Sequence, residues 1–389
     1  MVHFHIIKLL IIAFYLRGVE MNQNIESHVI EKREDYEKIL SEFGISKIDK
    51  ILPRIGTDNL FFRRGVVFAH RDFGKILDRV EQKKSFAIIS GRGPSNDLHF
   101  GHLILYDLIR HLQDKYECKY FLPFSDDEKY VFRKVNSLEE TYKLAIQNAI
   151  DIFAIGFKPE NVSAYISSMT PRIHYLALTF SVNQTFNAVK SALGLSGEEN
   201  TGVINYTNIQ AAHILHPTTD YDLPVVVPIG LDQDVFIRLT RDVARKRKIT
   251  LPASLYIKYL KGLTGGPMSS SAEETCVFLR DEPKTIKKKI MNALTGGRTT
   301  IKEQRELGAN PEICTIFDWF SKYFVEDDDE LDKIEAGCRG GDLICGLDCK
   351  PNLIGMVLKY QEKYNRRKEE VVKNLDRYFE HEIDLSIIE

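Results

Sequence analysis

The turn from Gly91 to His102 constrains the fold of this chain more than any other segment. It follows a short apolar run at 85–90, which is typical of a buried parallel strand. It precedes a pattern in which Leu105, Leu108 and Leu112 recur at helical spacing. The sequence therefore predicts a strand, a glycine-rich turn and a helix, the element order of an α/β sheet with an anion-binding turn.

Two histidines give this turn its chemistry. His99 and His102 are three residues apart and face the same way at the predicted helix start. That helix start offers backbone N–H groups and a positive dipole end to an anion. Gly101, between the histidines, lets a flat ring approach the backbone. The turn suits a nucleotide, although the turn alone leaves open a tight turn with two surface histidines.

The same residues carry a family resemblance. The segment from His99 to His102 resembles the "HIGH" signature of class I aminoacyl-tRNA synthetases. The segment from Gly91 to Ser95 resembles the archaeal and eukaryotic tryptophanyl-tRNA synthetases, and Met268 to Ser271 resembles the "KMSKS" signature. The resemblance extends over roughly residues 60 to 375 through further segments in family order: Arg63 to Asp72, Asp126 to Lys129, Ile209 to Ala212, Asp232 to Asp234, Arg238 to Asp242 and Thr295 to Arg298.

The resemblance implies a tryptophan–tRNA ligase. Such an enzyme joins the carboxylate of tryptophan to the α-phosphate of ATP, releases pyrophosphate, and then transfers tryptophan to tRNA(Trp). Neither step needs a protein nucleophile, so catalysis rests on positioning and on stabilising phosphate charge, which Mg²⁺ held largely by the phosphates would share. The implied catalytic residues are His99, His102, Ser269 and Ser271. The implied ATP site is Gly91, Arg92, Gly93, Pro94, His99, Gly101, His102, Met268, Ser269, Ser270 and Ser271, with no resident metal site.

The resemblance also implies a site for the amino acid. Glu128, Gln210 and Gln233 would hold the ammonium and carboxylate of tryptophan, and their side-chain types suit a zwitterion. For Glu128 alone, a surface acid remains the alternative. The full implied set is Ile89, Pro123, Glu128, Lys129, Gln210 and Gln233. Ile89 stands where the eukaryotic enzymes have tyrosine and Pro123 where they have glutamine, so this pocket holds the indole by apolar packing or finds another acceptor.

The second signature departs from the family pattern. Pro267 stands where the family usually has its first lysine, and proline supplies neither a charge nor an N–H. Lys261 and Arg298 are the cations that we expect to compensate. Two other functions stay open, a tyrosine–tRNA ligase and a non-catalytic paralogue that binds tRNA or a protein partner. Ile89 and Pro123 offer no buried partner for a phenol hydroxyl, which disfavours the tyrosine enzyme.

Charge and cysteine content limit which partners and which cellular compartment fit the sequence. The formal net charge is −2, so a nucleic-acid partner requires local basic runs, here 245–248 and 284–289, whose alternative is a solvated face. Six cysteines in 389 residues predict no disulfide framework, and reduced thiols fit a cytoplasmic enzyme. Three of them, Cys338, Cys345 and Cys349, cluster, but free thiols are favoured over zinc because their spacing is not that of a zinc site.

The chain divides into four predicted parts. Residues 1–21 are an apolar extension, too short to span a bilayer comfortably, or a mis-assigned start ahead of Met21. Residues 22–80 form an N-terminal extension with a helix at 29–43 and β structure at 59–72. The other two parts are a Rossmann-like α/β catalytic domain at 81–279, with a helical insertion at 127–220, and an all-helical anticodon-binding domain at 280–389.

Within these parts the sequence marks several elements. Strands are expected at 84–90, 119–124, 223–231 and 276–279, and the insertion contains a helix capped by Ser137 with Glu140 three residues later. By resemblance, the insertion carries a homodimer interface. No membrane association is expected.

Overall fold

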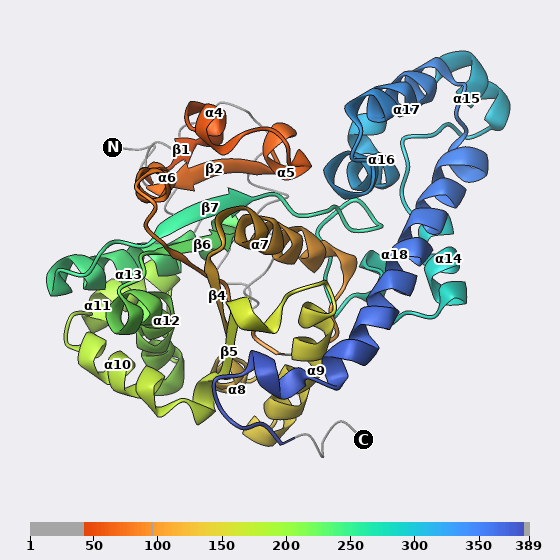
Figure 1. Ribbon diagram of the computed structural model, residues 1–389. Helices are drawn as coiled ribbons and strands as arrows, with labels where there is room; N and C mark the ends of the chain where they lie inside the picture. The colour runs from red at the N-terminus through yellow and green to blue at the C-terminus, as the bar shows by residue number, and fades with distance from the viewer. Residues whose placement is uncertain (1–42, 95, 385–389) are drawn as a thin grey trace.

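The computed structural model describes residues 43–94 and 96–384 and is built on one seven-stranded sheet (Figure 1). The strands are β1 (Ser46–Lys47), β2 (Val67–Arg71), β3 (Ala87–Ile89), β4 (Lys119–Phe124), β5 (Val162–Ile166), β6 (Val225–Ile229) and β7 (Ala253–Ile257). Their order across the sheet is β1-β2-β7-β6-β3-β4-β5. Strands β3 to β7 pair in parallel with one another, whereas β2 pairs antiparallel with both β7 and β1 at one side of the sheet. The predicted extension at 1–21 and the predicted helix up to residue 42 lie outside the described residues.

Helices cover both faces of the sheet. They are α4 (Leu52–Ile55), α5 (Leu60–Arg63), α6 (Phe73–Glu81), α7 (Leu103–Tyr116), α8 (Asp126–Val131), α9 (Leu138–Phe153), α10 (Pro171–Ser181), α11 (Phe186–Leu193), α12 (Thr201–Tyr221), α13 (Asp234–Arg247), α14 (Pro283–Met291), α15 (Ile301–Leu307), α16 (Thr315–Trp319), α17 (Asp328–Gly340) and α18 (Lys350–Val372). Alternate strand residues point to opposite faces, so Tyr120 and Leu122 join the core formed with α7 and α9. Phe121 and Tyr165 join the core formed with α10, α12 and α13.

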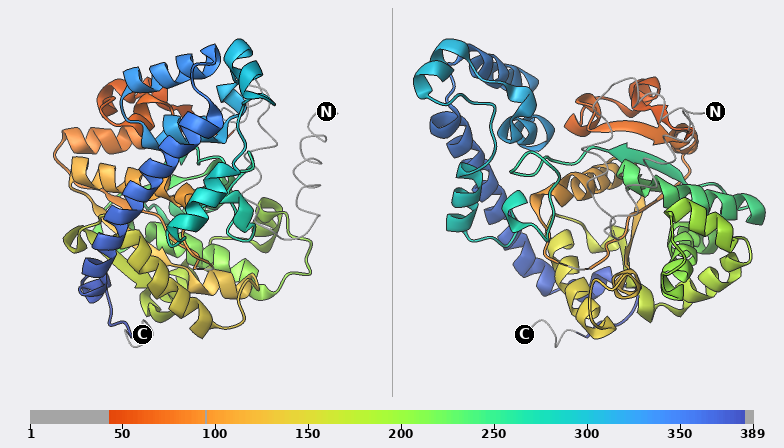
Figure 2. Two further views of the ribbon diagram at one scale, coloured as in Figure 1. Left: turned by 90° about the vertical axis from the view of Figure 1, so that its right-hand side faces the viewer. Right: turned by 180° about the vertical axis from the view of Figure 1, so that it is seen from behind.

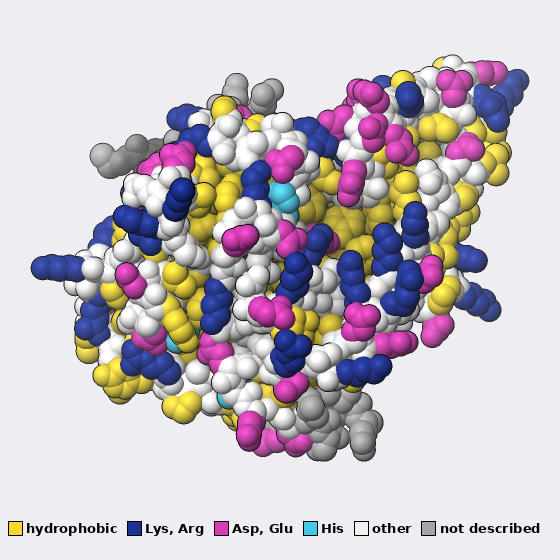
Figure 3. All heavy atoms as spheres, in the orientation of Figure 1, with side chains coloured by type: hydrophobic (Ala, Val, Ile, Leu, Met, Phe, Trp, Pro, Cys, Tyr) yellow, Lys and Arg dark blue, Asp and Glu magenta, His cyan; other side chains and the backbone are white. Residues whose placement is uncertain are grey.

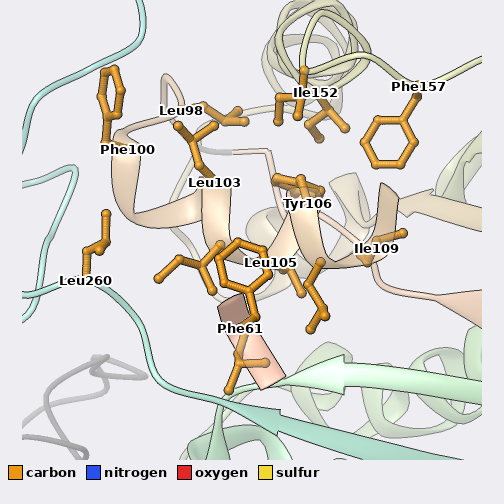
Figure 4. Close-up of a cluster of buried hydrophobic side chains, with 14 of the residues drawn as sticks. Phe61, Leu98, Phe100, Leu103, Leu105, Tyr106, Ile109, Ile152, Phe157 and Leu260 are labelled. Carbon is orange, nitrogen blue, oxygen red and sulfur yellow. The ribbon is translucent and has the colours of Figure 1, made fainter. Parts of the chain in front are cut away.

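The core around α7 connects the sheet to the N-terminal and C-terminal helices. In Figure 4, Ile152 of α9 lies on the side of α7 that carries Leu103 and Tyr106, and Phe61 of α5 lies on the other side, beside Leu105. All five side chains are less than a tenth exposed. This burial fixes the start of α7, where the histidine turn ends.

The structure confirms part of the predicted strand pattern and corrects the rest. The strand predicted at 119–124 is β4, and those predicted at 84–90 and 223–231 are the shorter β3 and β6. The 127–220 insertion is not purely helical, because it contributes β5 to the sheet. The segment 276–279 is not a strand, although Phe278 forms an isolated bridge with His99. Part of 59–72 is the helix α5, and β7 was not predicted.

The predicted helix start at Ser137 is confirmed, and the structure shows a second capped start at Asp327. The Glu140 N–H donates to Ser137 Oγ at 3.1 Å, so Ser137 caps α9. Asp327 caps α17 by accepting from the Glu330 N–H at 2.7 Å, so the acidic run at 326–330 begins a helix. Negative side chains at these positions also match the positive end of the helix dipole.

The C-terminal part of the described chain is helical, as predicted: no strand follows β7 within 258–384. Helices α15 to α17 stand apart from the sheet, and the long α18 leads back toward it (Figures 1 and 2). Beyond α18, Phe379 forms an isolated bridge with Ala164 of β5, and the Glu380 N–H donates to the Ala164 carbonyl at 2.9 Å. The C-terminal segment therefore covers the exposed edge of the sheet.

Candidate active site

Three of the predicted site segments meet at one edge of the sheet. The chain order reverses at β3, which lies between β4 and β6. In such sheets, ligands bind in the crevice at the carboxyl ends of the strands next to this reversal. The histidine turn follows β3, the acidic segment at 126–129 follows β4, and 232–233 follows β6. The topology thus places segments that are far apart in sequence at the carboxyl ends of neighbouring strands.

The two histidines form a buried stacked pair. Their ring centroids lie 3.9 Å apart, and His99 and His102 are 3 % and 9 % exposed. Both ring nitrogens of His99 are buried without a partner among the described residues. Burial, with a smaller contribution from Arg92, lowers the pKa of His99 to about 3, and burial also holds the pKa of His102 well below its usual value. Both rings are therefore neutral at pH 7 and act as hydrogen-bonding groups.

The turn contains more donors than acceptors. Arg92 donates from Nη1 to His102 Nε2 at 3.0 Å and from Nε to Asn148 Oδ1 at 2.8 Å. The His99 backbone N–H approaches the other ring nitrogen of His102, Nδ1, at 3.2 Å. A neutral imidazole accepts at only one nitrogen, so these two donors cannot both be satisfied. A surplus of donors beside the orphaned His99 ring fits an anion such as a phosphate.

The two signature segments touch at Gly101. A Cβ at this position would lie 2.9 Å from both His99 Nδ1 and Met268 Sδ. The Phe100 N–H donates to the Val277 carbonyl at 3.0 Å, and the Leu279 N–H to the Leu98 carbonyl at 2.9 Å. The segment after the second signature is therefore hydrogen-bonded to the first, and only glycine fits at the contact.

The serines of the second signature lie on a loop held mainly by its own contacts. The Ser269 and Ser271 hydroxyls are 2.9 Å apart, and the Ser269 N–H donates to Thr275 Oγ1 at 3.0 Å. Ser270 lines a cavity of about 290 Å³ that the turn just before His99 also borders; its other lining residues are Asn96, Asp97, Glu273, Phe278, Arg280 and Asp281. Hydroxyls and backbone donors are thus available beside the histidine turn.

Neither predicted substitute for the missing lysine is directed at these serines. Pro267 pairs with Lys261 in an isolated backbone bridge. The Lys261 ammonium donates to the Glu312 carbonyl at 2.7 Å, and Arg298 Nε donates to the Gly308 carbonyl at 3.0 Å. In this conformation the Lys261 contact joins the loop to the C-terminal part, and the Arg298 contact lies within that part.

The amino-acid part of the site gathers around Glu128. Its carboxylate pairs with Lys129 Nζ at 2.9 Å and lies 3.2 Å from the Tyr206 hydroxyl, which is 2.7 Å from Gln210 Oε1. A Cβ on Gly93 would lie 2.8 Å from Glu128 Oε2, so the turn after β3 packs directly on this group. Glu128 is only 9 % exposed, which removes the surface-acid interpretation.

The sequence analysis did not identify Tyr206 as part of this group. The sequence did contain a pattern that could have identified it, because Tyr206 and Gln210 are four residues apart on α12 and so share one helix face. Gln233 stands apart from the group: its amide donates to Asp232 Oδ2 at 2.6 Å at the end of β6.

The two positions that depart from the family pattern form an apolar wall. Ile89 is 1 % exposed and is paired with Phe121 across β3 and β4. Pro123 lies against the turn, because a Cβ on Gly91 would be 3.0 Å from Pro123 Cγ. Pro94, in the same turn, is buried. This wall offers no side-chain acceptor at either position.

Metal ligation and membrane spanning find no support within 43–94 and 96–384. No three His, Cys, Asp or Glu side chains there are grouped to hold a metal ion. The six cysteines are free thiols, four of them buried. No described helix combines the length and the apolar character needed to cross a bilayer.

The comparisons with known proteins identify the class first. The family model described as class I tRNA synthetases (W and Y) matches residues 81–358, and the chain belongs to this family. Two relatives within this class are tryptophan–tRNA ligases. The tryptophan–tRNA ligase of Methanocaldococcus jannaschii is 39 % identical over 88 % of this chain and 95 % of that protein, and that of Pyrococcus furiosus is 36 % identical over 88 % and 90 %.

Two solved structures are similar to this chain over most of its length. The tryptophanyl-tRNA synthetase of Aeropyrum pernix superposes with a TM-score of 0.83 at 32 % identity, covering 90 % of this chain and 97 % of that chain. The tryptophanyl-tRNA synthetase of Encephalitozoon cuniculi, solved bound to tryptophan, gives 0.79 at 28 % identity, covering 91 % and 98 %. The predicted α/β catalytic fold with a helical C-terminal region is confirmed.

Proposed function

We propose that this chain is a tryptophan–tRNA ligase. It activates tryptophan with ATP to tryptophanyl-adenylate and pyrophosphate, and then transfers tryptophan to tRNA(Trp). The observation that carries this proposal is the junction at Gly101, where two buried neutral histidines with surplus donors meet the serine loop beside the Glu128 group. Relatives of this length and identity support the same reaction.

The proposed mechanism needs no protein nucleophile. His99, His102 and the Arg92 guanidinium donate to the phosphates of ATP, and Ser269 and Ser271 donate from the facing loop. These donors are worth most where negative charge develops during adenylation, in a site that excludes water. Mg²⁺ enters with the phosphates of ATP and shares their charge, since the described residues offer no cluster for a resident ion.

The proposed amino-acid site explains the rest of the geometry. Glu128 takes the substrate ammonium, and Gln210 and Gln233 bind from α12 and from the end of β6. Lys129 neutralises Glu128 while the site is empty. The substrate ammonium then replaces the Lys129 ammonium beside Glu128, so binding adds little desolvation cost.

One assay separates the candidate functions: ATP–pyrophosphate exchange with tryptophan, with tyrosine and with no amino acid, followed by aminoacylation of tRNA(Trp). Exchange that depends on tryptophan is the expected result. Stimulation by tyrosine alone would assign the sister enzyme. Exchange with neither amino acid would leave a non-catalytic paralogue.

We also propose that the protein is a homodimer. Five large apolar side chains on and around α10 and α11 are exposed, from 46 % to 80 %: Met169, Tyr175, Leu178, Val182 and Phe186. Figure 3 shows apolar surface at the lower left, where these helices lie in Figure 1. Patches of this kind mark interfaces, and a two-fold dimer buries the same patch on both copies. Val182→Asp should yield a monomer in sedimentation, whereas Leu307→Asp on the distant α15 should not.

The remaining partner is the tRNA. The 284–289 run lies on α14, where Lys284, Lys287 and Lys288 are exposed. These lysines suit phosphate contacts, and the C-terminal helices beyond them would bind the anticodon arm. The free thiols fit a cytoplasmic enzyme.

A further inference from the structure

Four buried polar side chains form a hydrogen-bonded chain that the mechanism above does not use. The Tyr165 hydroxyl lies 3.1 Å from His213 Nδ1, and His213 Nε2 lies 3.1 Å from Ser167 Oγ. The Ser167 hydroxyl donates to Asp127 Oδ2 at 2.6 Å. Tyr165 and Ser167 are completely buried, and His213 and Asp127 are 1 % and 8 % exposed. A buried chain of this kind has a defined direction for each proton.

The chain borders the amino-acid site through three different elements. Tyr165 of β5 lies directly across from Pro123 of β4 in the parallel register. His213 lies three residues after Gln210 on α12. Asp127 precedes Glu128, whose N–H donates to Asp127 Oδ1 at 2.9 Å. Tyr165 is therefore the polar residue that pairs with Pro123 of the apolar wall across β4 and β5.

The direction of the protons follows from the end of the chain. An ionised Asp127 has no proton to give, so the Ser167 hydroxyl must donate to it. The Ser167 oxygen then accepts from His213 Nε2–H. The neutral ring is left with Nδ1 as an acceptor for the Tyr165 hydroxyl. Burial lowers the pKa of His213 to about 3, so the ring is neutral at physiological pH. The Tyr165 oxygen is left with lone pairs and no donor among the described residues.

We propose that the Tyr165 hydroxyl oxygen accepts the indole N–H of tryptophan and so determines the specificity of the pocket. His213, Ser167 and Asp127 are positioning residues that keep this oxygen an acceptor. The proposal rests on the proposed function, because it assigns a role within the tryptophan site. Its chemical reason is that Ile89 and Pro123 provide no side-chain acceptor, and a buried N–H without a partner weakens binding.

The state of Asp127 controls the polarity of the chain. A protonated Asp127 can donate to Ser167, which reverses every bond and turns the Tyr165 hydroxyl into a free donor facing another donor. The pKa of Asp127 is raised to about 7, mainly by burial and further by its neighbours Asp126 and Glu128, whereas the Ser167 hydroxyl and the Glu128 backbone N–H lower it. The other titratable groups near it are Tyr206 and His213 of α12. Recognition of the N–H should therefore weaken below about pH 7.

The experiment compares tryptophan with β-(3-benzothienyl)alanine, in which sulfur replaces the ring N–H. Amino-acid-dependent ATP–pyrophosphate exchange by the full chain gives kcat/KM for each. The wild type should prefer tryptophan by about ten- to a hundredfold, and Tyr165→Phe should reduce this preference to about threefold or less while still using the analogue. Tyr120→Phe is the matched control, because its buried hydroxyl donates to the Ser90 carbonyl and its ring packs in the core on the other face of the sheet.

The outcomes separate this proposal from the proposed function. A Tyr165→Phe enzyme that keeps the wild-type preference, or a wild type without preference, overturns the role of Tyr165. A wild type inactive with both compounds instead counts against tryptophan ligation itself. Where Tyr165→Phe is inactive with both compounds, the wild-type preference between pH 6 and 8.5 decides. A fall below about pH 7 that Asp127→Asn abolishes supports the proposal, and a flat profile overturns it.

Discussion

Adding one methyl group at Gly101 should push the two signature segments apart. The new Cβ would lie 2.9 Å from His99 Nδ1 and 2.9 Å from Met268 Sδ, whereas atoms in ordinary contact lie about 3.5–4.0 Å apart. His99 and Met268 are 3 % and 4 % exposed, so neither side chain can move out into solvent. Relief therefore requires the buried His99 and Met268 side chains, or the turn and the loop that carry them, to shift by about 0.6–1.1 Å.

The size of the effect follows from that displacement. A misplacement of about 1 Å between catalytic groups costs on the order of 10² in rate, equivalent to about 2.7 kcal/mol. Overpacking a buried contact costs about 1–3 kcal/mol of stability. Gly101→Ala should therefore lower kcat for tryptophan-dependent ATP–pyrophosphate exchange about a hundredfold. It should also raise the KM for ATP and lower the melting temperature by several degrees.

Gly266→Ala is the matched control on the serine loop, because a Cβ there meets nothing within 4 Å. It should retain exchange within about twofold of the wild type, since surface substitutions away from special contacts change stability little. Exchange by Gly101→Ala within threefold of wild type would refute the steric reasoning. Equal damage from Gly266→Ala would show that the loss is not specific to the contact at Gly101.

Four further predictions concern single residues of the site. Glu128→Ala should raise the KM for tryptophan at least tenfold and leave the KM for ATP nearly unchanged in initial-rate measurements, because the substrate ammonium loses its counter-charge. Pro267→Lys should speed single-turnover adenylation by up to about 10². Lys261→Ala should leave that rate within about twofold, because the Lys261 ammonium already donates to the Glu312 carbonyl; a strong slowing would show that the loop moves. His99 is neutral when folded, with a pKa of about 3, whereas in the unfolded chain it takes up a proton below about pH 6.5. The free energy of unfolding of the wild type relative to His99→Asn should therefore fall as the pH drops from 6.5 toward 3, which urea titrations at pH 7.5 and 5 can measure.

The sequence predicted those elements whose signals are local. The strand at 119–124 and the cap at Ser137 depend on neighbouring residues only, and the structure contains them. The strands β5 and β7 were missed because five-residue runs containing a serine carry little periodicity. Both are buried on both faces, with Ser163 and Ser254 at most 3 % exposed, so tertiary context decided their structure.

The candidate site was also predictable only where its signals are local. Residue types and order indicated the histidine turn, the serine loop and the acidic segment. Their mutual contacts, such as Gly101 with Met268, depend on packing between segments more than 160 residues apart, which no local pattern encodes. The expected compensation by Lys261 illustrates the limit. Closeness in sequence suggested it, yet the folded loop directs that ammonium toward the C-terminal helices.

Consecutive residues of the histidine turn serve different partners, which explains why so short a segment constrains the whole chain. His99 stacks on His102 and pairs with Phe278, Phe100 stacks on Trp319 of the C-terminal helices at 5.8 Å between centroids, and Gly101 is the contact between the signatures. Phe100 is completely buried and also meets Phe324 and Tyr360. A shift of the C-terminal helices must therefore move the backbone that carries both histidines. Substitutions at Phe100 and at Gly101 should then act on one shared geometry, and their effects should not add.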